Sequence, residues 1–191
     1  MALDRDEVID AAVRILDEYG MADLSMRRLA DSLGVKAGAL YWHVANKQSL
    51  LAAVADRILR EVPDVEVSDV EIPEVESTPS EAEALAGWAV GLRQVLLRHR
   101  DSADLVATGL ASGLCEGDPL AGVRALLEPV VGADAARRGS RALLHLVLGH
   151  VAEEQNLQIF AQLGSGAAVD PVEQGLAFEH GIGALISGLL R

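Results

Sequence analysis

The sequence predicts an all-α fold, in which a small N-terminal module of three helices precedes a larger helical domain. Half of the 191 residues are hydrophobic, whereas only 3% are aromatic. The apolar residues are mainly Ala, Leu and Val, and they recur at helical spacing rather than in alternation, which favours a bundle of helices. Residues that commonly cap helices precede several of these segments, and glycines follow them.

The first helix is expected over about residues 5–19. Asp4 and Glu7 have the spacing of a capping box at its start. Gly20 stands where helices commonly end. The apolar residues between these ends form one stripe: Val8, Ala11, Ala12, Ile15, Leu16 and Tyr19.

Two short helices follow, joined by a turn that contains a glycine. Ser25 is a favourable N-cap for a helix over residues 26–33, which Gly34 ends. A third helix is expected from about Ala37 to His43. Two short helices joined by a turn of three to four residues are the layout of a helix-turn-helix.

A fourth helix, capped by Asn46, is expected to connect this module to the rest of the chain over residues 48–62. Residues 63–79 are acidic and contain prolines, and we interpret them as a loop. An edge strand is the alternative for this segment, because valines and glutamates alternate briefly within it. Helical spacing then resumes over about residues 80–99, 103–111, 119–131, 133–163 and 172–191.

The charge is unevenly distributed along the chain. The formal net charge is −13, which by itself argues against binding to nucleic acid. Residues 27–47, however, contain four basic residues and one acidic residue, whereas residues 64–83 contain eight acidic residues and no basic one. A local basic face can meet phosphates while the rest of the molecule stays acidic.

Several classes of protein are not expected. Cys115 is the only cysteine, so a disulfide within one chain is excluded. The sequence has no nucleophile elbow, phosphate-binding loop or zinc-protease motif, so we do not expect an enzyme. We expect a cytoplasmic protein without membrane contact, because no signal peptide is evident and the apolar run over residues 142–151 is too short to span a bilayer.

The helix-turn-helix segment resembles the DNA-binding module of the TetR family of transcriptional regulators, and most closely its tetracycline-repressor type. The resemblance rests on Leu24 to Val35, on Leu40-Tyr41-Trp42-His43-Val44 and on Asn46-Lys47. A weaker resemblance to the C-terminal domain of that type rests on Leu97 to Asp101, Leu148 to Val151, Glu153 to Gln155 and Phe178 to Leu189.

This resemblance implies a ligand-responsive repressor with two helical domains. Residues 1–47 would form the DNA-binding domain, and residues 48–191 would bind an effector and form a homodimer. The helices over about 133–163 and 172–191 would pair across a two-fold axis, as their extensive apolar surfaces favour. The two recognition helices would then lie about 34–36 Å apart, matching a palindromic operator. A small-molecule effector would release the operator.

We expect double-stranded operator DNA to be contacted by cationic, aromatic and small residues of this module. An aromatic pair on a helix is, taken alone, more often part of a core, but the flanking cations and the glycine turn favour DNA binding. The candidate residues are Arg27, Arg28, Lys36, Ala37, Gly38, Ala39, Tyr41, Trp42, His43 and Lys47.

The start of the third helix departs from the tetracycline-repressor type. Ala37, Gly38 and Ala39 stand where that type carries polar and proline residues that contact bases. Because these side chains form no hydrogen bonds, base readout must rely on Arg27, Lys36, thymine methyl groups and DNA shape. We therefore predict an operator different from the tetracycline operator.

The effector site also departs from that type. Tetracycline binders supply a histidine and a threonine where this chain has Val106 and Gly109, so we predict a largely apolar effector that is not tetracycline with magnesium. We expect no cofactor and no metal, because His150 and the glutamates beside it lack a further ligand. The candidate effector-site residues are Trp88, Leu92, Leu105, Val106, Gly109, Leu126, His145, Leu146, Gly149 and Glu153.

Two alternatives stay open. The chain could be a helical small-molecule carrier or interaction protein with weak or lost DNA binding, which the small residues at 37–39 would suit. It could also be an activator instead of a repressor, because whether the bound protein raises or lowers transcription depends on where the operator lies.

Overall fold

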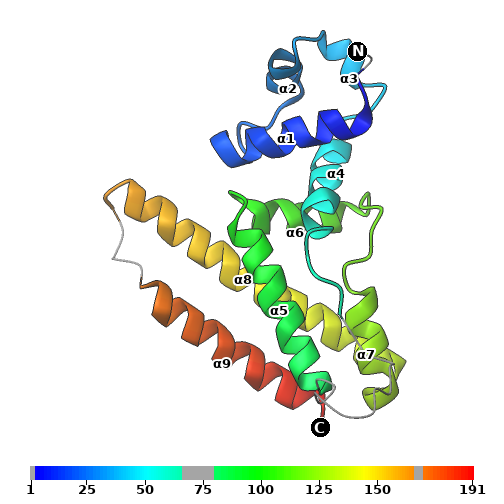
Figure 1. Cartoon of the computed structure of the whole chain (residues 1–191), viewed down its shortest axis with the longest axis vertical. Coiled ribbons are helices and arrows are strands. Elements are labelled where there is room, and N and C mark those ends of the chain that lie inside the picture. The colour runs from blue at the N-terminus through cyan, green and yellow to red at the C-terminus, as the bar shows by residue number, and fades with distance from the viewer. Residues whose placement is uncertain (1–2, 66–79, 166–169) are drawn as a thin grey trace, which may run out of the picture. The chain divides into compact units, whose positions relative to one another are not determined.

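The computed structural model describes residues 3–65, 80–165 and 170–191, and every regular element within these ranges is a helix (Figure 1). The all-α prediction is therefore confirmed. Most of the segment that we interpreted as a loop or edge strand, residues 66–79, lies outside the described residues. The helices are α1 (Arg5–Tyr19), α2 (Met26–Leu33), α3 (Ala37–Leu40), α4 (Lys47–Leu59), α5 (Glu81–Leu97), α6 (Ser102–Ser112), α7 (Ala121–Val131), α8 (Ala133–Gln162) and α9 (Pro171–Leu189).

The chain divides into two compact units, and neither is a continuous segment. Unit 1 contains Met1–Glu61 and Val95–Asp118, and unit 2 contains Val62–Gln94 and Pro119–Arg191. We had placed a boundary after residue 47, whereas α4 packs against both α1 and α6 inside unit 1. Whether residues 1–47 act as a separate functional domain stays a prediction.

The helix ends in unit 1 follow local sequence signals. The side chain of Asp4 accepts a hydrogen bond from the backbone N–H of Glu7, and the Glu7 carboxylate accepts one from the N–H of Asp4, which completes the capping box. Ser25 and Asn46 cap α2 and α4 in the same way through their side-chain oxygens. These caps explain why the starts of α1, α2 and α4 lie close to the predicted residues.

Unit 1 is built on an aliphatic core. The helices α1, α2 and α3 pack in sequence, α4 packs on α1, and α6 packs on α4. The large side chains that are fully buried here are Leu16, Leu24, Leu29, Leu40, Leu50, Ile58, Leu96 and Leu105.

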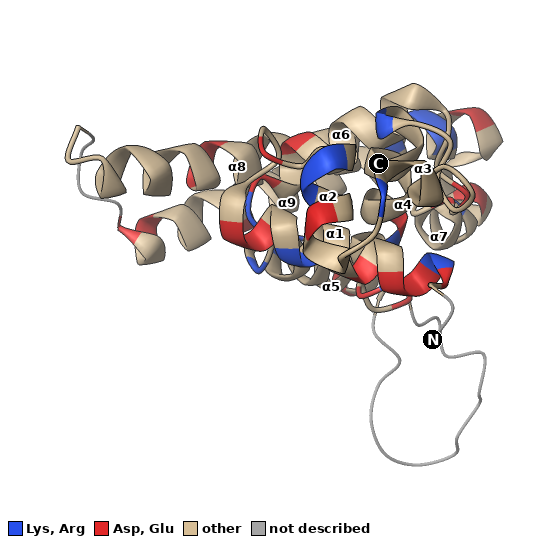
Figure 2. Ribbon diagram, turned by 90° about the horizontal axis from the view of Figure 1, so that it is seen from above, with Lys and Arg blue, Asp and Glu red and all other residues tan. Residues whose placement is uncertain are grey.

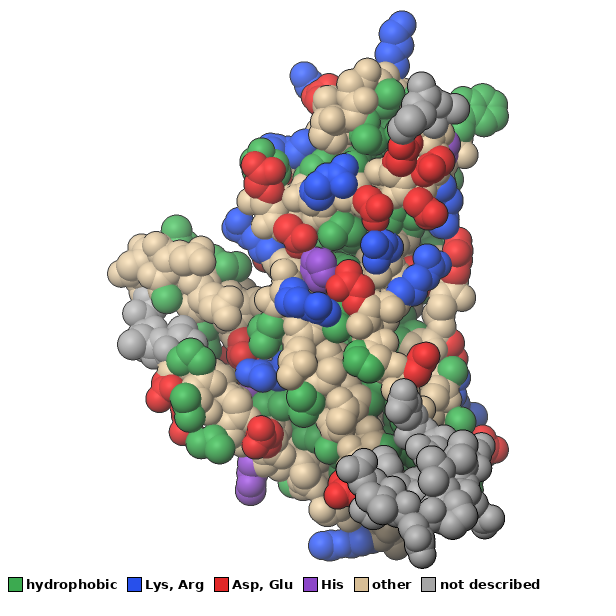
Figure 3. Space-filling model, in the orientation of Figure 1, with side chains coloured by type: hydrophobic (Ala, Val, Ile, Leu, Met, Phe, Trp, Pro, Cys, Tyr) green, Lys and Arg blue, Asp and Glu red, His purple; other side chains and the backbone are tan. Residues whose placement is uncertain are grey.

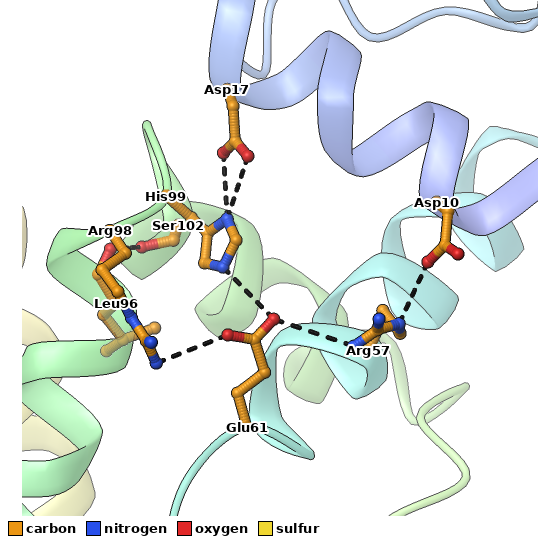
Figure 4. A network of polar contacts seen from close by, with 8 residues as sticks. All are labelled: Asp10, Asp17, Arg57, Glu61, Leu96, Arg98, His99 and Ser102. Atoms are coloured by element: carbon orange, nitrogen blue, oxygen red, sulfur yellow. Dashed lines mark hydrogen bonds and ion pairs between the residues drawn. The ribbon is translucent and has the colours of Figure 1, made fainter.

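A polar network links three parts of unit 1 (Figure 4). Nδ1 of His99, in the turn before α6, lies 3.0 Å from Oδ1 of Asp17 on α1. The Nε2 atom of His99 lies 3.5 Å from Oε1 of Glu61, just beyond α4. Arg57 on α4 pairs with both Glu61, at 3.7 Å, and Asp10 on α1, at 3.1 Å. Side chains from three sequence-distant segments thus fix α1 against α4 and the turn before α6.

Unit 2 contains most of α5 together with α7, α8 and α9, and α8 packs against both α7 and α9 (Figure 1). Arg93 on α5 forms two hydrogen bonds, of 2.7 and 2.8 Å, with the carboxylate of Glu154 on α8. The Glu154 side chain is only 6% exposed, so this is a largely buried ion pair. The guanidinium of Arg93 also lies over the ring of Phe178 on α9, so one cluster joins three helices.

Candidate nucleic-acid interface and effector site

The turn between α2 and α3 has the backbone geometry of a helix-turn-helix. Gly34 adopts a left-handed conformation, with φ 66° and ψ 27°, in which other residues are strained. The N–H of Val35 donates to the carbonyl oxygen of Ala30 at 3.0 Å and closes the end of α2. The chain can therefore change direction within a few residues, and α3 packs on α2.

Two buried aliphatic residues anchor α3. Leu40 is fully buried, and Val44 is 3% exposed. The expected inward face is thus confirmed. The α-helix is shorter than predicted, because it ends at Leu40 and residues 41–43 form a turn. The N–H groups of His43 and Val44 both donate to the carbonyl oxygen of Leu40, at 2.9 Å, so the backbone stays tightly coiled through this turn.

The aromatic residues after α3 face outward. Tyr41 is 55% exposed and Trp42 is 91% exposed, whereas His43 is half-buried. The alternative that Tyr41 and Trp42 belong to the core is therefore wrong. Two large aromatic side chains exposed next to each other, Tyr41 and Trp42, form an apolar patch, and exposed apolar patches often mark contact surfaces.

Three of the predicted cations are available for a ligand. Arg27, Lys36 and Lys47 are exposed, and they form no ion pair with any described part of the chain. Figure 2 shows the basic positions of α2 next to its acidic one. Figure 3 shows acidic and basic side chains intermixed over the face in view. For binding to DNA phosphates, the presence of particular unpaired cations therefore matters more than the net charge of the protein.

Arg28 differs from these three cations. Its Nη2 lies 2.7 Å from Oδ1 of Asp23, and its guanidinium lies 4.3 Å from the ring centroid of Tyr19. Sequence reasoning placed Arg28 beside Arg27 as an equivalent contact and missed this pairing. The signal was present, because Asp23 precedes α2 by three residues and Tyr19 closes α1. The geometry gives Arg28 a role in holding the start of α2 against the end of α1.

The candidate effector-site residues of unit 1 lie on α6. Leu105, Val106 and Gly109 are all buried. A Cβ added to Gly109 would lie 2.8 Å from Cβ of Ala55 and 3.3 Å from Sγ of Cys115. The glycine thus allows the close approach of α6 to α4.

The candidate effector-site residues of unit 2 fall into two groups. Trp88, Leu92 and Leu126 are buried, and Leu146 is half-buried. His145, Gly149 and Glu153 instead form a stripe on the exposed face of α8. Within unit 2 the structure therefore does not bring this second group into the core that contains the first.

Sequence reasoning could not assign the faces of α8. The buried side of this helix includes Leu143, Val147, Val151 and Glu154. His150 Nε2 lies 3.2 Å from the buried carboxylate of Glu154 and 3.0 Å from the carbonyl oxygen of Gln174. We had singled out Glu153 rather than Glu154 because of the resemblance to the tetracycline-repressor type. A helix that is apolar nearly all round gives no periodicity from which to choose between adjacent residues.

The described residues contain neither a cluster of metal ligands nor a membrane-spanning helix. Over residues 3–65, 80–165 and 170–191, no group of three or more His, Cys, Asp or Glu side chains is arranged to hold a metal ion. Within the same ranges, no helix combines the length and the apolar character needed to cross a membrane.

Comparison with known proteins places these features in a family. The model of "Bacterial regulatory proteins, tetR family" matches residues 8–54, which contain α2, the turn, α3 and most of α4. The tetracycline repressor protein class C of Escherichia coli is 32% identical over 209 aligned positions, covering 98% of this chain and 90% of that protein.

Solved structures of similar proteins extend the comparison to the whole chain. BioQ of Mycobacterium smegmatis is 34% identical with a TM-score of 0.85, and the match covers 98% of both chains. A structure of BioQ with its natural double-stranded DNA operator has 34% identity, a TM-score of 0.79 and 98% coverage of both chains. A variant of TetR from Acinetobacter baumannii AYE in complex with minocycline is 30% identical, with a TM-score of 0.76 and coverage of 97% and 96%.

Proposed function

Since the chain belongs to the tetR family of bacterial regulatory proteins, we propose that it represses transcription by binding a palindromic operator as a homodimer and leaves that operator when a small effector binds. The chain is a DNA-binding transcriptional regulator of this family and not an enzyme. Its proposed location is the cytoplasm, where its operator would be.

The observation that carries the operator proposal is the surface around α3. Trp42 is 91% exposed, although Leu40 two residues earlier is fully buried. Arg27, Lys36 and Lys47 are exposed nearby in the sequence and unpaired within the described chain. Lys36 directly precedes α3 and Lys47 begins α4, where the helix dipole also favours a phosphate. We assign phosphate contacts to these cations and groove contacts to the residues from Ala37 to His43.

We propose a more limited DNA contact for Arg28 than for Arg27, Lys36 and Lys47. Its pairing with Asp23 and Tyr19 supports a positioning role for α2, with a phosphate reached only through the guanidinium edge that these partners leave open. Removal of Arg27 should therefore weaken DNA binding directly, whereas removal of Arg28 should also loosen the start of α2.

The exposed apolar faces of α8 and α9 support the homodimer. On α9, Val172 is 70% exposed and Leu176 is 57% exposed, and near the end of α8 Phe160 is 53% exposed. Exposed apolar residues along two helices that pack on each other are typical of a surface covered by a second copy. His145, Gly149 and Glu153 lie on the exposed face of α8 and would be near such an interface.

For the effector we propose a small, largely apolar molecule other than tetracycline with magnesium. Val106 and Gly109 carry no metal-ligating atoms in their side chains, and both are buried. The buried apolar residues Trp88, Leu92 and Leu126 support an apolar ligand. A thermal-shift titration with tetracycline and magnesium should leave Tm unchanged, and a large increase of Tm would contradict the proposal.

The main test selects duplexes from a random library with the purified protein and measures their affinity by fluorescence anisotropy. We expect palindromic ligands whose log Kd rises linearly with log salt concentration, because phosphate contacts release counterions. Arg27→Ala should weaken binding and lower the salt slope by about 1. Arg138→Ala, which removes an exposed arginine of α8, is the matched control and should change neither quantity.

Two outcomes would contradict the repressor proposal and favour one of the alternative functions. If no duplex is selected even at low salt, the chain is a small-molecule carrier or interaction protein. If a duplex is selected and transcription from it rises with added protein, the chain is an activator.

A further inference from the structure

Gly38 has no structural reason to be a glycine. It is exposed, its φ lies outside the left-handed region, and a Cβ built on it meets no atom within 4 Å. An alanine would therefore fit the free protein without strain, and it would favour the helix. The folded chain by itself thus places no demand on this position.

Position 38 lies on the outward face of α3. Leu40 on the opposite face is fully buried, while Ala37 and Gly38 are exposed. Tyr41, with φ −66° and ψ −14°, continues the helical geometry, so Tyr41 and Trp42 lie one turn beyond residues 37 and 38 on the same face. Two exposed aromatic side chains therefore border a strip that carries only the methyl groups of Ala37 and Ala39 and, at Gly38, bare backbone. We call residues 37–39 the bare strip.

The chemistry of the bare strip limits what it can read in a DNA groove. Base edges in the major groove are distinguished by hydrogen-bond donors and acceptors and by the C5 methyl group of thymine. The side chains of Ala37, Gly38 and Ala39 offer no donor or acceptor. Apolar contact with a thymine methyl is the direct readout that remains open to these side chains. The absence of a side chain at residue 38 lets the helix backbone come close enough to make it.

We propose that the bare strip selects thymine in each operator half-site through its C5 methyl group, and that Gly38 determines this specificity by leaving room for the methyl. This inference rests on the proposed operator binding. Arg27 and Lys36 would hold the phosphates on either side of the contact, which positions the strip without supplying sequence information.

The first experiment removes only the methyl group from the DNA. In the operator selected from the random library, each thymine is replaced in turn by deoxyuridine, which keeps all hydrogen bonds. At one or more positions per half-site we expect affinity to fall by about fourfold, the effect of one buried methyl group. At such a position, a cytosine should bind worse than 5-methylcytosine.

The second experiment adds a methyl group to the protein. Gly38→Ala should raise Tm, because the helix gains propensity and nothing is displaced, yet it should weaken operator binding and reduce the difference between thymine and deoxyuridine. The matched control is Gly87→Ala on α5, which is also exposed with no neighbour within 4 Å. It should raise Tm and leave affinity unchanged.

The outcomes separate this inference from the function on which it rests. Failure to select any duplex would overturn both. Tight binding with no difference between thymine and deoxyuridine at any position, or with unchanged affinity for Gly38→Ala, would overturn the inference alone.

Discussion

Cys115 is a residue whose reactivity is set by its surroundings. Its thiol lies 3.8 Å from the carbonyl oxygen of Ala52. Burial, together with the nearby carboxylate of Asp56, raises the pKa of Cys115 to about 11. The thiolate is the nucleophilic form, so a raised pKa makes the side chain inert at neutral pH.

Alkylation measures this directly. At pH 8, iodoacetamide should modify Cys115 about two orders of magnitude more slowly than an unfolded control, in proportion to the smaller thiolate fraction. The raised pKa of the folded state also means that stability is fully present below pH 9 and falls as the pH rises through 11. A Cys115→Ser variant should lose this alkaline decline, and reaction at the rate of the unfolded control would contradict the assignment.

Trp42 and Leu40 lie two residues apart but differ in burial, so their substitutions should have different effects. Trp42→Ala should change the free energy of unfolding by less than about 0.5 kcal/mol, because the indole is 91% exposed, but it should weaken operator binding. Leu40→Ala should cost about 2–5 kcal/mol, because Leu40 is fully buried. Urea unfolding and fluorescence anisotropy check the two effects, and a large loss of stability in Trp42→Ala would show that the ring has a structural role.

Among the helices, the contact between α4 and α6 depends on one small residue. Gly109→Ala gains the same helix propensity as Gly87→Ala, but its new Cβ would lie 2.8 Å from that of Ala55. We therefore expect Gly109→Ala to lower stability by about 1–3 kcal/mol, as overpacking does, and Gly87→Ala to raise it. Thermal unfolding of both variants tests this, and equal increases of Tm would mean that α4 and α6 separate without cost.

Helix boundaries were predictable where a local signal marks them. The predicted range of α1 is the observed one, because Asp4 and Gly20 act within a few residues of its ends. The shortened α3 was not predictable, since no residue at 41–43 is a helix breaker and the turn depends on the burial of Leu40 and Val44. The partners of Arg28 and His99 depend on packing between distant segments, which sequence spacing does not report.

At the level of the whole molecule, assembly is the property that the exposed apolar surface predicts. Leu176→Asp places a charge at a side chain that is 57% exposed on α9, so it should leave the protomer folded but weaken self-association. Light scattering should show a dimer for the wild type and a shift towards monomer for the variant. Glu128→Asp on α7 is a conservative control at another exposed site, and a monomeric wild type at micromolar concentration would contradict the proposal.

The two units are interleaved along the chain, which passes from one to the other three times, after Glu61, Gln94 and Asp118. A DNA-binding head cut from this protein at residue 47 would lose α4, and one cut at residue 61 would lose the α6 surface that covers Ala52 and Ala55. Fusing the head to another sensor domain would therefore require grafting residues 95–118 as well.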